Sequence, residues 1–235
     1  MEKLRRILTW VLALVFGLGT VLGLALTAVE IVTFDVDRFT DAYDRYDRAA
    51  FIGIAPEDLR EVTQTMLDYL QDKNDSLLMF AQIQGEEQQV FEERELLHMV
   101  DVKGLFMGGY AIRRWGVILA AASLVGLILL EKKKCLRWLC KGYLIALAGF
   151  AAAGIALGIV MAVDFNAAFI KFHEIFFDND LWLLDLRTDV LIQMFPEEFF
   201  NEMAVAYLTW MLSSLVIPAL AALAGLIVTR RREKA

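Results

Sequence analysis

The chain contains only two histidines, His98 and His173. An imidazole takes up and releases a proton near neutral pH, so two of them in one site suit general acid–base catalysis. Metal binding is the alternative chemistry, but neither histidine belongs to a His-Glu-x-x-His sequence or another compact ligand spacing. The pair is therefore our candidate catalytic site, with no metal expected in it.

His98 lies in an acidic segment, residues 92–103, that favours a helix. Glu95 and Asp101 are each three residues from His98, so on a helix both reach its face. A carboxylate beside an imidazole fixes its tautomer and stabilises the imidazolium ion. We expect Glu95 and Asp101 to support His98, and Lys103 either to stabilise a developing negative charge or to meet lipid phosphates. Taken alone, the segment fits an ordinary surface histidine in a charged helix better than a catalytic one.

His173 belongs to a stripe in which Phe165, Phe169, His173 and Phe177 repeat at intervals of four. That spacing places the four rings on one face of a helix. Aromatic side chains near the end of a membrane span usually pack at the lipid–water interface, and this role would account for the phenylalanines. An ionisable histidine within the stripe is not accounted for in this way and indicates a functional position.

Four apolar stretches predict how these residues are held. They cover residues 7–29, 115–130, 142–163 and 203–228, and a helix needs about 20 apolar residues to cross a bilayer. Hydrophobic residues make up 58% of the chain. The sequence therefore predicts a mainly α, integral membrane four-helix bundle with an extracytoplasmic cap built from two outer loops.

Basic residues give the orientation, because they are retained on the cytoplasmic side of the spans they flank. They gather before the first stretch, between the second and third, and after the fourth, where Arg232 and Lys234 are among them. The other two connections carry 17 acidic and 7 basic residues (35–112) and 9 acidic and 2 basic residues (164–202). Both termini are thus expected in the cytoplasm and both histidines outside. This acidic surface also argues against a nucleic-acid partner.

The predicted segments are a first span with its N-terminus (1–34), the cap (35–112), a second span (113–130), a cytoplasmic loop (131–141), a third span (142–163), an outer loop (164–202) and a fourth span with its tail (203–235). In the cap, residues 55–71 and 86–106 favour helices, and the second of these is expected to end before Gly104, Gly108 and Gly109. Residues 35–54 are poorly periodic and predict extended or looped chain, and residues 76–83 predict a strand.

Several further residues are expected near the substrate. Glu30 and Asp164 lie near the outer ends of spans, where a charge is costly unless it is wetted or paired. We expect at least one of them to line a substrate cavity. The other residues assigned to this cavity are Phe169, Phe172 and Trp182. Asp185 is expected either to orient a histidine or to cap the next helix.

These segments together resemble the lipoprotein intramolecular transacylase family of bacterial membrane proteins. The resemblance rests on Glu-x-x-His-Met-Val-Asp-Val-Lys at residues 95–103, on Phe-His-x-x-Phe-Phe, and on Trp-x-Leu-Asp-x-x-Thr-Asp-x-Leu-Ile-x-x-Phe-Pro-Glu-x-Phe-Phe. It covers nearly the whole chain. One position departs from the pattern, since Leu186 stands where we expect proline.

The resemblance implies an enzyme, an acyltransferase of the bacterial cell membrane that acts on the diacylglyceryl-modified N-terminus of a lipoprotein among membrane lipids. Its reaction moves an acyl chain from the sn-2 ester to the α-amine of the modified cysteine, which gives the lyso-form lipoprotein. The two histidines of the family correspond to His98 and His173, and no cofactor is implied. We expect His98, with Asp101, to be the base and His173 to be a proton donor or oxyanion stabiliser. The alternatives are a non-enzymatic membrane sensor or accessory protein and a membrane metallohydrolase.

Overall fold

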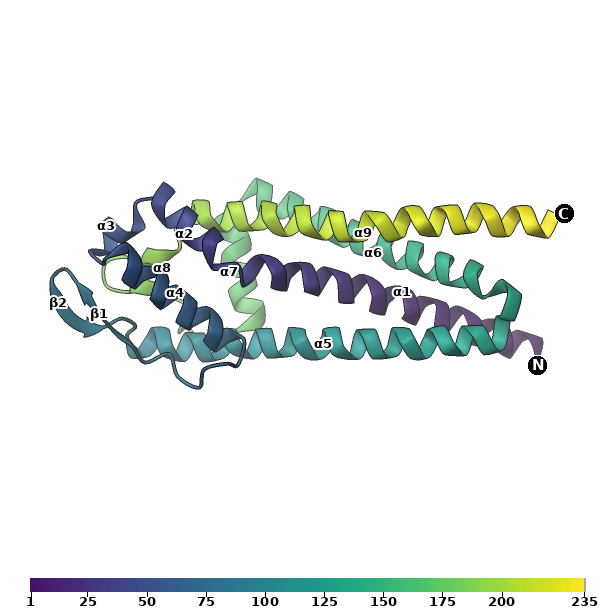
Figure 1. Cartoon of the computed structure of the whole chain (residues 1–235), viewed down its shortest axis with the longest axis horizontal. Coiled ribbons are helices and arrows are strands. Elements are labelled where there is room, and N and C mark those ends of the chain that lie inside the picture. Colours follow the sequence, from purple (N-terminus) through teal and green to yellow (C-terminus); the bar gives the residue numbers. More distant parts are fainter. Residues whose placement is uncertain (235) are drawn as a thin grey trace. The chain divides into compact units, whose positions relative to one another are not determined.

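The computed structural model describes residues 1–234, with side chains as far as Arg231, and it is mainly helical (Figure 1). Ala235 and the side chains of Arg232 and Lys234, which were assigned to the cytoplasmic tail, lie outside the described part. The elements are α1 (Glu2–Thr33), α2 (Val36–Arg45), α3 (Arg48–Ile52), α4 (Pro56–Leu70), β1 (Phe80–Ile83), β2 (Glu86–Gln89), α5 (Glu93–Glu131), a 3₁₀ turn η1 (Lys132–Lys134), α6 (Cys135–Val163), α7 (Phe165–Phe176), α8 (Val190–Met194) and α9 (Glu197–Lys234).

Within the described residues, three helical stretches are long and apolar enough to cross a membrane: Glu2–Thr33, Glu93–Val163 and Glu197–Arg231. The second stretch is 71 residues long because it contains two helices, α5 and α6, joined through η1. Each of the four apolar segments predicted from the sequence therefore lies in a helix of its own. The chain is a membrane protein by these helices and by the similarities reported below.

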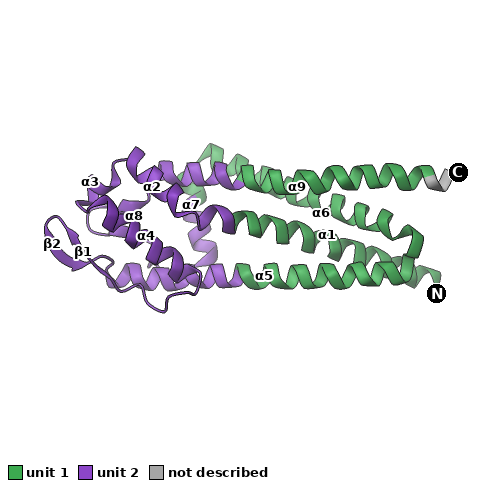
Figure 2. Cartoon of the chain, viewed as in Figure 1, with its two compact units in different colours: residues 1–29, 109–168, 208–235 green, residues 30–108, 169–207 purple. Residues whose placement is uncertain are grey.

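Contacts divide the chain into two compact units, coloured in Figure 2. Unit 1 comprises residues 1–29, 109–168 and 208–235. Helices α1 and α6 approach so closely in it that a Cβ added at Gly142 would overlap the backbone of Ala13. The hydroxyl of Tyr143 donates to the carbonyl of Leu215 at 2.8 Å, which joins α6 to α9. Small residues and one buried hydroxyl thus hold unit 1 together, as is typical where lipid removes the hydrophobic drive for helix association.

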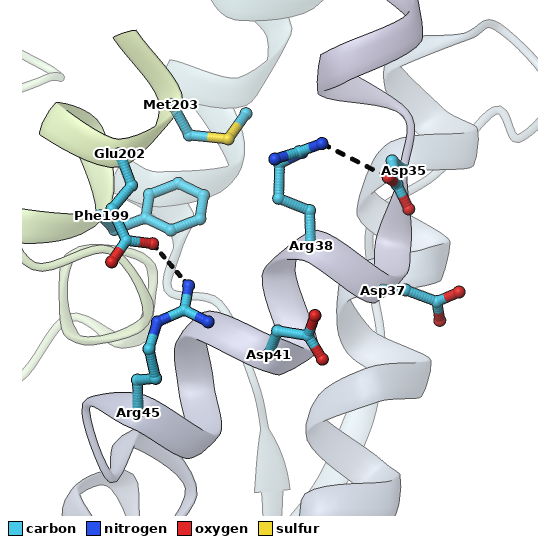
Figure 3. A pocket seen from close by; sticks show the side chains of 8 residues that line it. All are labelled: Asp35, Asp37, Arg38, Asp41, Arg45, Phe199, Glu202 and Met203. Carbon is cyan, nitrogen blue, oxygen red and sulfur yellow. Dashed lines mark hydrogen bonds and ion pairs between the residues drawn. The ribbon is translucent and has the colours of Figure 1, made fainter. Parts of the chain in front are cut away.

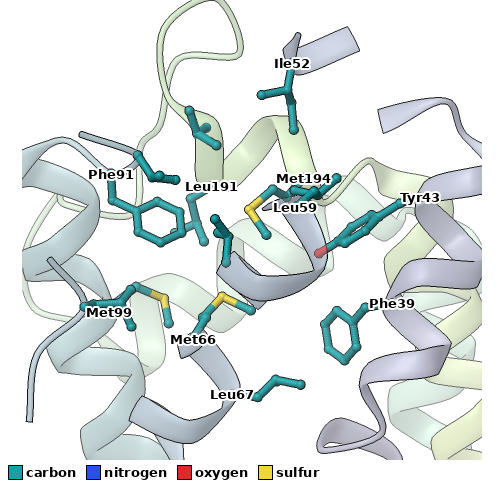
Figure 4. Close-up of a cluster of buried hydrophobic side chains, with 14 of the residues drawn as sticks. Phe39, Tyr43, Ile52, Leu59, Met66, Leu67, Phe91, Met99, Leu191 and Met194 are labelled. Carbon is teal, nitrogen blue, oxygen red and sulfur yellow. The ribbon is translucent and has the colours of Figure 1, made fainter. Parts of the chain in front are cut away.

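Unit 2 comprises residues 30–108 and 169–207 and has a dense apolar core, shown in part in Figure 4. Helix α2 packs against α4, and α3 packs against α8. Phe91, Ile52 and Leu59 are among the largest fully buried side chains. These three residues belong to the first predicted outer loop, and the fully buried Met194 of the second lies in the same cluster. The two predicted outer loops therefore form one core within this unit.

Helix α4 confirms the helix predicted at residues 55–71. Pro56 stands in its first turn, where a missing N–H costs nothing, and Glu57 and Asp58 follow at the positive end of the helix dipole. Leu59 and Val62, at helical spacing, are buried on its inner face. Sequence and structure agree here because end signals and periodicity point the same way.

Residues 35–54, whose fold the sequence left open and which could have been extended or looped, form α2 and α3. Phe39, Ala42 and Tyr43 are the buried residues of α2, and the charged residues between them obscured this short apolar stripe. Gly53 then ends α3 with φ +80°, a left-handed conformation that glycine adopts without steric cost.

The segment 76–93 contains a hairpin that was predicted only in part. Strand β1 pairs with β2 in antiparallel register, from Phe80 opposite Gln89 to Ile83 opposite Glu86. The two residues between the strands, Gln84 and Gly85, both have positive φ, as a type I′ turn requires. The predicted helix therefore begins at Glu93, later than expected.

The same helix does not end before Gly104, Gly108 and Gly109, as was predicted, but continues without a break to Glu131. A glycine inside a helix costs roughly 1 kcal/mol relative to alanine. A break beside lipid would cost more, because each exposed backbone N–H or C=O would lose its partner. The apolar surroundings thus override the local preference of three glycines.

Candidate active site

His98 and His173 come together inside unit 2. Their ring centroids are 6.0 Å apart with an angle of 35° between the planes. His98 is carried by the first turns of α5 and His173 by α7, and both side chains are more than nine-tenths buried. Phe177 closes the pair on one side, 5.2 Å from His98 and 5.5 Å from His173 between ring centroids. Two residues 75 positions apart therefore form one shielded site.

The tautomer of His173 is set by its own helix. Nδ1 lies 2.8 Å from the backbone carbonyl oxygen of Phe169. A carbonyl only accepts hydrogen bonds, so Nδ1 carries the proton and donates, and Nε2 of the neutral ring bears the lone pair. Burial lowers the pKa of His173 below its usual value, although the bond to Phe169 opposes this shift. The neutral ring is therefore a proton acceptor at a single atom.

Aromatic rings surround His173. Phe169 is 4.2 Å away, Trp182 is 4.8 Å away at an angle of 31°, and Phe172 is 5.4 Å away, all between ring centroids. The structure thus places three of the predicted cavity residues against this histidine. Apolar walls of this kind exclude water and favour the uncharged imidazole.

His98 differs in having an open ring position. Its Nδ1 is buried and has no hydrogen-bond partner among the described residues. Burial, with a smaller contribution from His173, lowers the pKa of His98 to about 4, and Asp101 opposes the shift. An unsatisfied buried polar atom costs about 1–3 kcal/mol, which a hydrogen bond from a bound molecule would recover.

The carboxylate of Glu95 binds two backbone N–H groups and not His98. One oxygen accepts from the backbone N–H of Glu92 at 2.7 Å, and the other accepts from the backbone N–H of Leu191 at 2.6 Å. Glu95 is fully buried, and this burial raises its pKa to about 7 against the effect of both N–H groups. Its carboxylate therefore joins the start of α5 to the start of α8, one turn before His98.

Asp101 and Lys103 have other partners as well. Asp101 accepts a hydrogen bond of 2.8 Å from the side-chain amide of Asn179. Lys103 lies 2.7 Å from a carboxylate oxygen of Asp72 and over the ring of Tyr69, 4.4 Å from its centroid. Asp101 thus faces the segment that follows α7, whereas Lys103 is bound to the end of α4.

Asp185 forms a local turn. Its carboxylate binds the guanidinium of Arg187, with distances of 2.6–3.2 Å, which lowers the pKa of Asp185 to about 2. Its backbone N–H donates to Asp189, and Asp189 is the N-cap residue of α8. Asp185 therefore shapes the chain before α8 and has no recorded contact with a histidine.

The two acidic residues expected in the cavity are placed as follows. Asp164 accepts a hydrogen bond of 2.8 Å from the backbone N–H of Ala167 and so caps α7. Glu30 is half-buried at the end of α1 that belongs to unit 2.

One pocket of unit 2, about 200 Å³ in volume, is lined by α2 and the first turns of α9 (Figure 3). Glu202 there binds Arg45 at 2.5 Å and the hydroxyl of Tyr46 at 2.5 Å. Phe199, on the pocket wall, packs edge-to-face against Phe200, and Phe200 in turn packs against the tilted ring of Phe169 beside His173. The pocket is polar and separate from the histidine pair. The aromatic rings of Phe199, Phe200 and Phe169 connect the pocket wall to His173.

Sequence reasoning did not find Asn179 or Arg94. Asn179 binds Asp101, and Arg94 donates to the backbone carbonyl of Asp180 at 2.5 Å. Both tie α5 to the loop after α7, and no spacing rule reveals such long-range partners. The only signal was the crowding of polar residues beside the aromatic stripe.

Comparison with known proteins gives one consistent result. The profile of the family described as "Lipoprotein intramolecular transacylase Lit" matches residues 14–200. The in meso structure of the membrane integral lipoprotein intramolecular transacylase Lit from Bacillus cereus is similar to this chain with a TM-score of 0.73 and 21% identity, covering 99% of this chain and 100% of that one. No curated protein sequence matches the chain.

Two variants of the Bacillus cereus protein are similar to the same degree. One carries a histidine-to-arginine substitution and has a TM-score of 0.72 at 20% identity, covering 100% of this chain and 96% of that one. The other carries a histidine-to-alanine substitution and has a TM-score of 0.72 at 20% identity, covering 98% and 97%. At this level of identity the structures establish a common fold, and the profile establishes the family.

Proposed function

The chain belongs to the lipoprotein intramolecular transacylase family, and from this premise we propose that it moves an acyl chain within a bacterial lipoprotein. The chain would pass from the sn-2 ester of the diacylglyceryl-cysteine to the α-amine of the same cysteine. One C–N bond forms, one C–O bond breaks, and the sn-2 oxygen ends as a hydroxyl. The observation that carries this proposal is the buried, facing histidine pair in which the tautomer of His173 is fixed.

In this proposal His173 is the base. The α-amine has an ordinary pKa of about 7.7–8.0, and it must lose a proton as it attacks the ester carbon. Nε2 of His173 accepts that proton, because Nδ1 is already bound to the Phe169 carbonyl. The same nitrogen then protonates the departing sn-2 oxygen. This assignment reverses the one we expected from the sequence, since Asp101 is bound to Asn179 and not to His98.

In this proposal His98 stabilises the negative charge that develops on the oxyanion. Its lowered pKa keeps the ring neutral at pH 7, so it acts through an N–H donor and not as a cation. A donor directed at the oxyanion stabilises the transition state more than the ground state. The ester and the amine belong to one molecule, so holding them in a near-attack geometry supplies much of the remaining acceleration.

We also propose that α1, α5, α6 and α9 each cross the membrane as a four-helix bundle. Both termini would then be cytoplasmic, and the histidines of unit 2 would face outward as an extracytoplasmic cap. The support is the distribution of basic residues, among them Lys132–Lys134 of η1, which separates α5 from α6. Reporter fusions at residue 133 and at residue 75 should report opposite sides of the membrane.

The decisive experiment is fragmentation mass spectrometry of a lipoprotein N-terminal peptide from cells that express the protein. Intact mass is not informative, because an internal acyl shift leaves it unchanged. Wild type should give an amide-linked acyl group, and His98→Ala and His173→Ala should lose it at normal membrane levels.

Glu174→Gln is the matched control. Glu174 is exposed on α7 next to His173 and forms only a surface ion pair with Lys171, so its removal should not change activity. If the acyl position is the same with and without the protein, the transacylase proposal is rejected. The chain would then fit the sensor or accessory class better.

A further inference from the structure

Asn179, in the loop between α7 and α8, has bonds to three partners. The side-chain amide of Asn179 donates to Asp101 at 2.8 Å, and its side-chain oxygen accepts from the backbone N–H of Leu181 at 3.0 Å. Its backbone carbonyl accepts from the indole N–H of Trp182 at 3.0 Å.

These partners lead to both histidines. Asp101 follows His98 by three residues and so lies on the same face of α5. Trp182 lies against the ring of His173, 4.8 Å between centroids and 31° between planes. Asn179 is thus bound to one residue near each imidazole, and it connects the helix of His98 with the indole that covers His173.

A second contact holds the same loop from the other side. Arg94, one turn before His98, donates to the backbone carbonyl of Asp180 and lies 3.6 Å from its carboxylate. Arg94 also donates to the backbone carbonyl of Leu183 at 3.5 Å, so it holds the backbone on both sides of Trp182. Asn179 differs in that it bonds both to Asp101 on α5 and to the indole N–H itself.

We propose that Asn179 is a positioning residue that sets the separation of the two imidazoles by bonding to Asp101 and Trp182 together. It does not itself touch the reacting atoms. Its effect on acyl transfer rests on the proposed function, whereas its effect on Trp182 does not.

The chemistry of the amide explains why asparagine is needed. Asp101 offers only acceptors when ionised, and Leu181 offers only a donor, so the bridging side chain must donate on one side and accept on the other. An aspartate at position 179 would keep the bond to Leu181 but would set two carboxylates against each other. Exchanging the two residues would restore the bond in the opposite direction.

The test compares wild type, Asn179→Asp, and the double variant Asn179→Asp with Asp101→Asn. The first measurement is Trp182 emission between about pH 7.5 and about pH 4, the range over which a histidine of lowered pKa takes up its proton. A Trp182→Phe variant is subtracted to remove the other tryptophans. An imidazolium in contact with an indole quenches it, so the wild-type difference signal should fall as the pH is lowered.

In Asn179→Asp this pH-dependent fall should shrink to less than about half, because the indole is released from its place over His173. The rate at which amide-linked acyl groups appear should drop roughly 10–10²-fold, as expected when reacting groups move by about 1 Å. The double variant should recover both signals. Asp178→Asn, a neighbouring exposed carboxylate, is the control and should behave as wild type.

An Asn179→Asp variant with the wild-type pH response overturns the proposal, and so does a double variant that recovers neither signal while remaining folded. Folding is checked by the thermal melting of each variant in detergent. If wild type moves no acyl group but the emission follows the predicted order, the proposed function fails and the positioning role stands.

Discussion

The two units place similar apolar residues in opposite surroundings. In unit 2, large apolar side chains such as Phe91 and Met194 are fully buried in a shared core. In unit 1, residues of the same kind lie on the outside, and Leu129 has 71% of its surface exposed. The most apolar parts of Glu93–Val163 and Glu197–Arg231 are only 6% and 11% buried within the chain. Lipid takes the place of protein as the partner of unit 1.

Because of this difference, hydropathy along the sequence identifies the helices of unit 1 but not the packing of unit 2. An uninterrupted apolar run identifies a span whatever its neighbours are, because the bilayer contacts it along its whole length. Burial in unit 2 depends on which helices meet, so its function depends on individual contacts. Substitutions should therefore have larger and more specific effects in unit 2 than in unit 1.

The largest effect is expected for His173→Asn. The asparagine amide can still donate to the Phe169 carbonyl, but the acceptor at Nε2 is lost. Acyl transfer should fall by about 10²–10⁴-fold, the usual contribution of a general base, while folding is kept. Fragmentation mass spectrometry measures the transfer and thermal melting measures the fold. An active His173→Asn variant would contradict the assignment of the base.

Phe91→Ala tests the core of unit 2. Phe91 is fully buried, and removing such a ring costs about 3–5 kcal/mol through lost contacts and the cavity that remains. Chemical denaturation in detergent, followed by near-ultraviolet circular dichroism, should show this loss. A change below about 1 kcal/mol would mean that unit 2 is not held by its core, since large buried residues rarely cost so little.

Glu95→Gln tests a single buried contact and its pH dependence. Loss of one accepted N–H bond should cost about 1–3 kcal/mol. The pKa of Glu95 is raised to about 7, so in wild type its contribution to stability is fully present below pH 4.5 and declines as the pH rises through 7. The pKa of His98 is lowered to about 4, so its contribution rises with pH between 4 and 6.5.

In wild type, the contributions of Glu95 and His98 to stability change in opposite directions as the pH rises. Without the carboxyl group, Glu95→Gln should become more stable as the pH is raised from 4.5 to 6.5, because the opposing contribution of Glu95 is gone and the lowered pKa values of the histidines remain. His98→Ala should show a smaller rise or a fall. Melting temperatures at three pH values between these limits measure how stability changes with pH. Equal changes in the two variants would refute the opposite contributions of Glu95 and His98.

The smallest effect is expected for Leu129→Ala in unit 1. Its side chain is largely exposed to the surroundings of the span and makes few contacts within the chain, so stability in detergent should change by less than about 0.5 kcal/mol. The measurement is the same denaturation used for Phe91→Ala. A loss as large as that of the core variant would remove the contrast between the units.

The sequence predicted the features that depend on local pattern. Helix α4, the apolar segments and the aromatic stripe around His173 follow from spacing and composition, and the histidine pair could be named from motif resemblance. The start of α5 could not be placed, because its buried Glu95 is held by Leu191, 96 positions away. Asn179 was missed for the same reason, since its partner Asp101 lies 78 positions before it.

One error and one open question came from weighing local signals alone. The three glycines of α5 indicate a break in water, but a helix beside lipid keeps its backbone bonds. The charged residues of α2 concealed Phe39 and Tyr43, which gain their stability only when α4 covers them. In both cases the surroundings decided the structure.

The bond from Nδ1 of His173 to the Phe169 carbonyl has a consequence for the reaction cycle. A ring held at one nitrogen cannot flip between turnovers without breaking that bond, so protons enter and leave through Nε2 alone. In the proposed reaction, the proton taken from the neutral amine is then the one returned to the glycerol oxygen, and the ring ends in the tautomer with which it began. Once the amine is neutral, no separate step would be needed to restore His173 between turnovers.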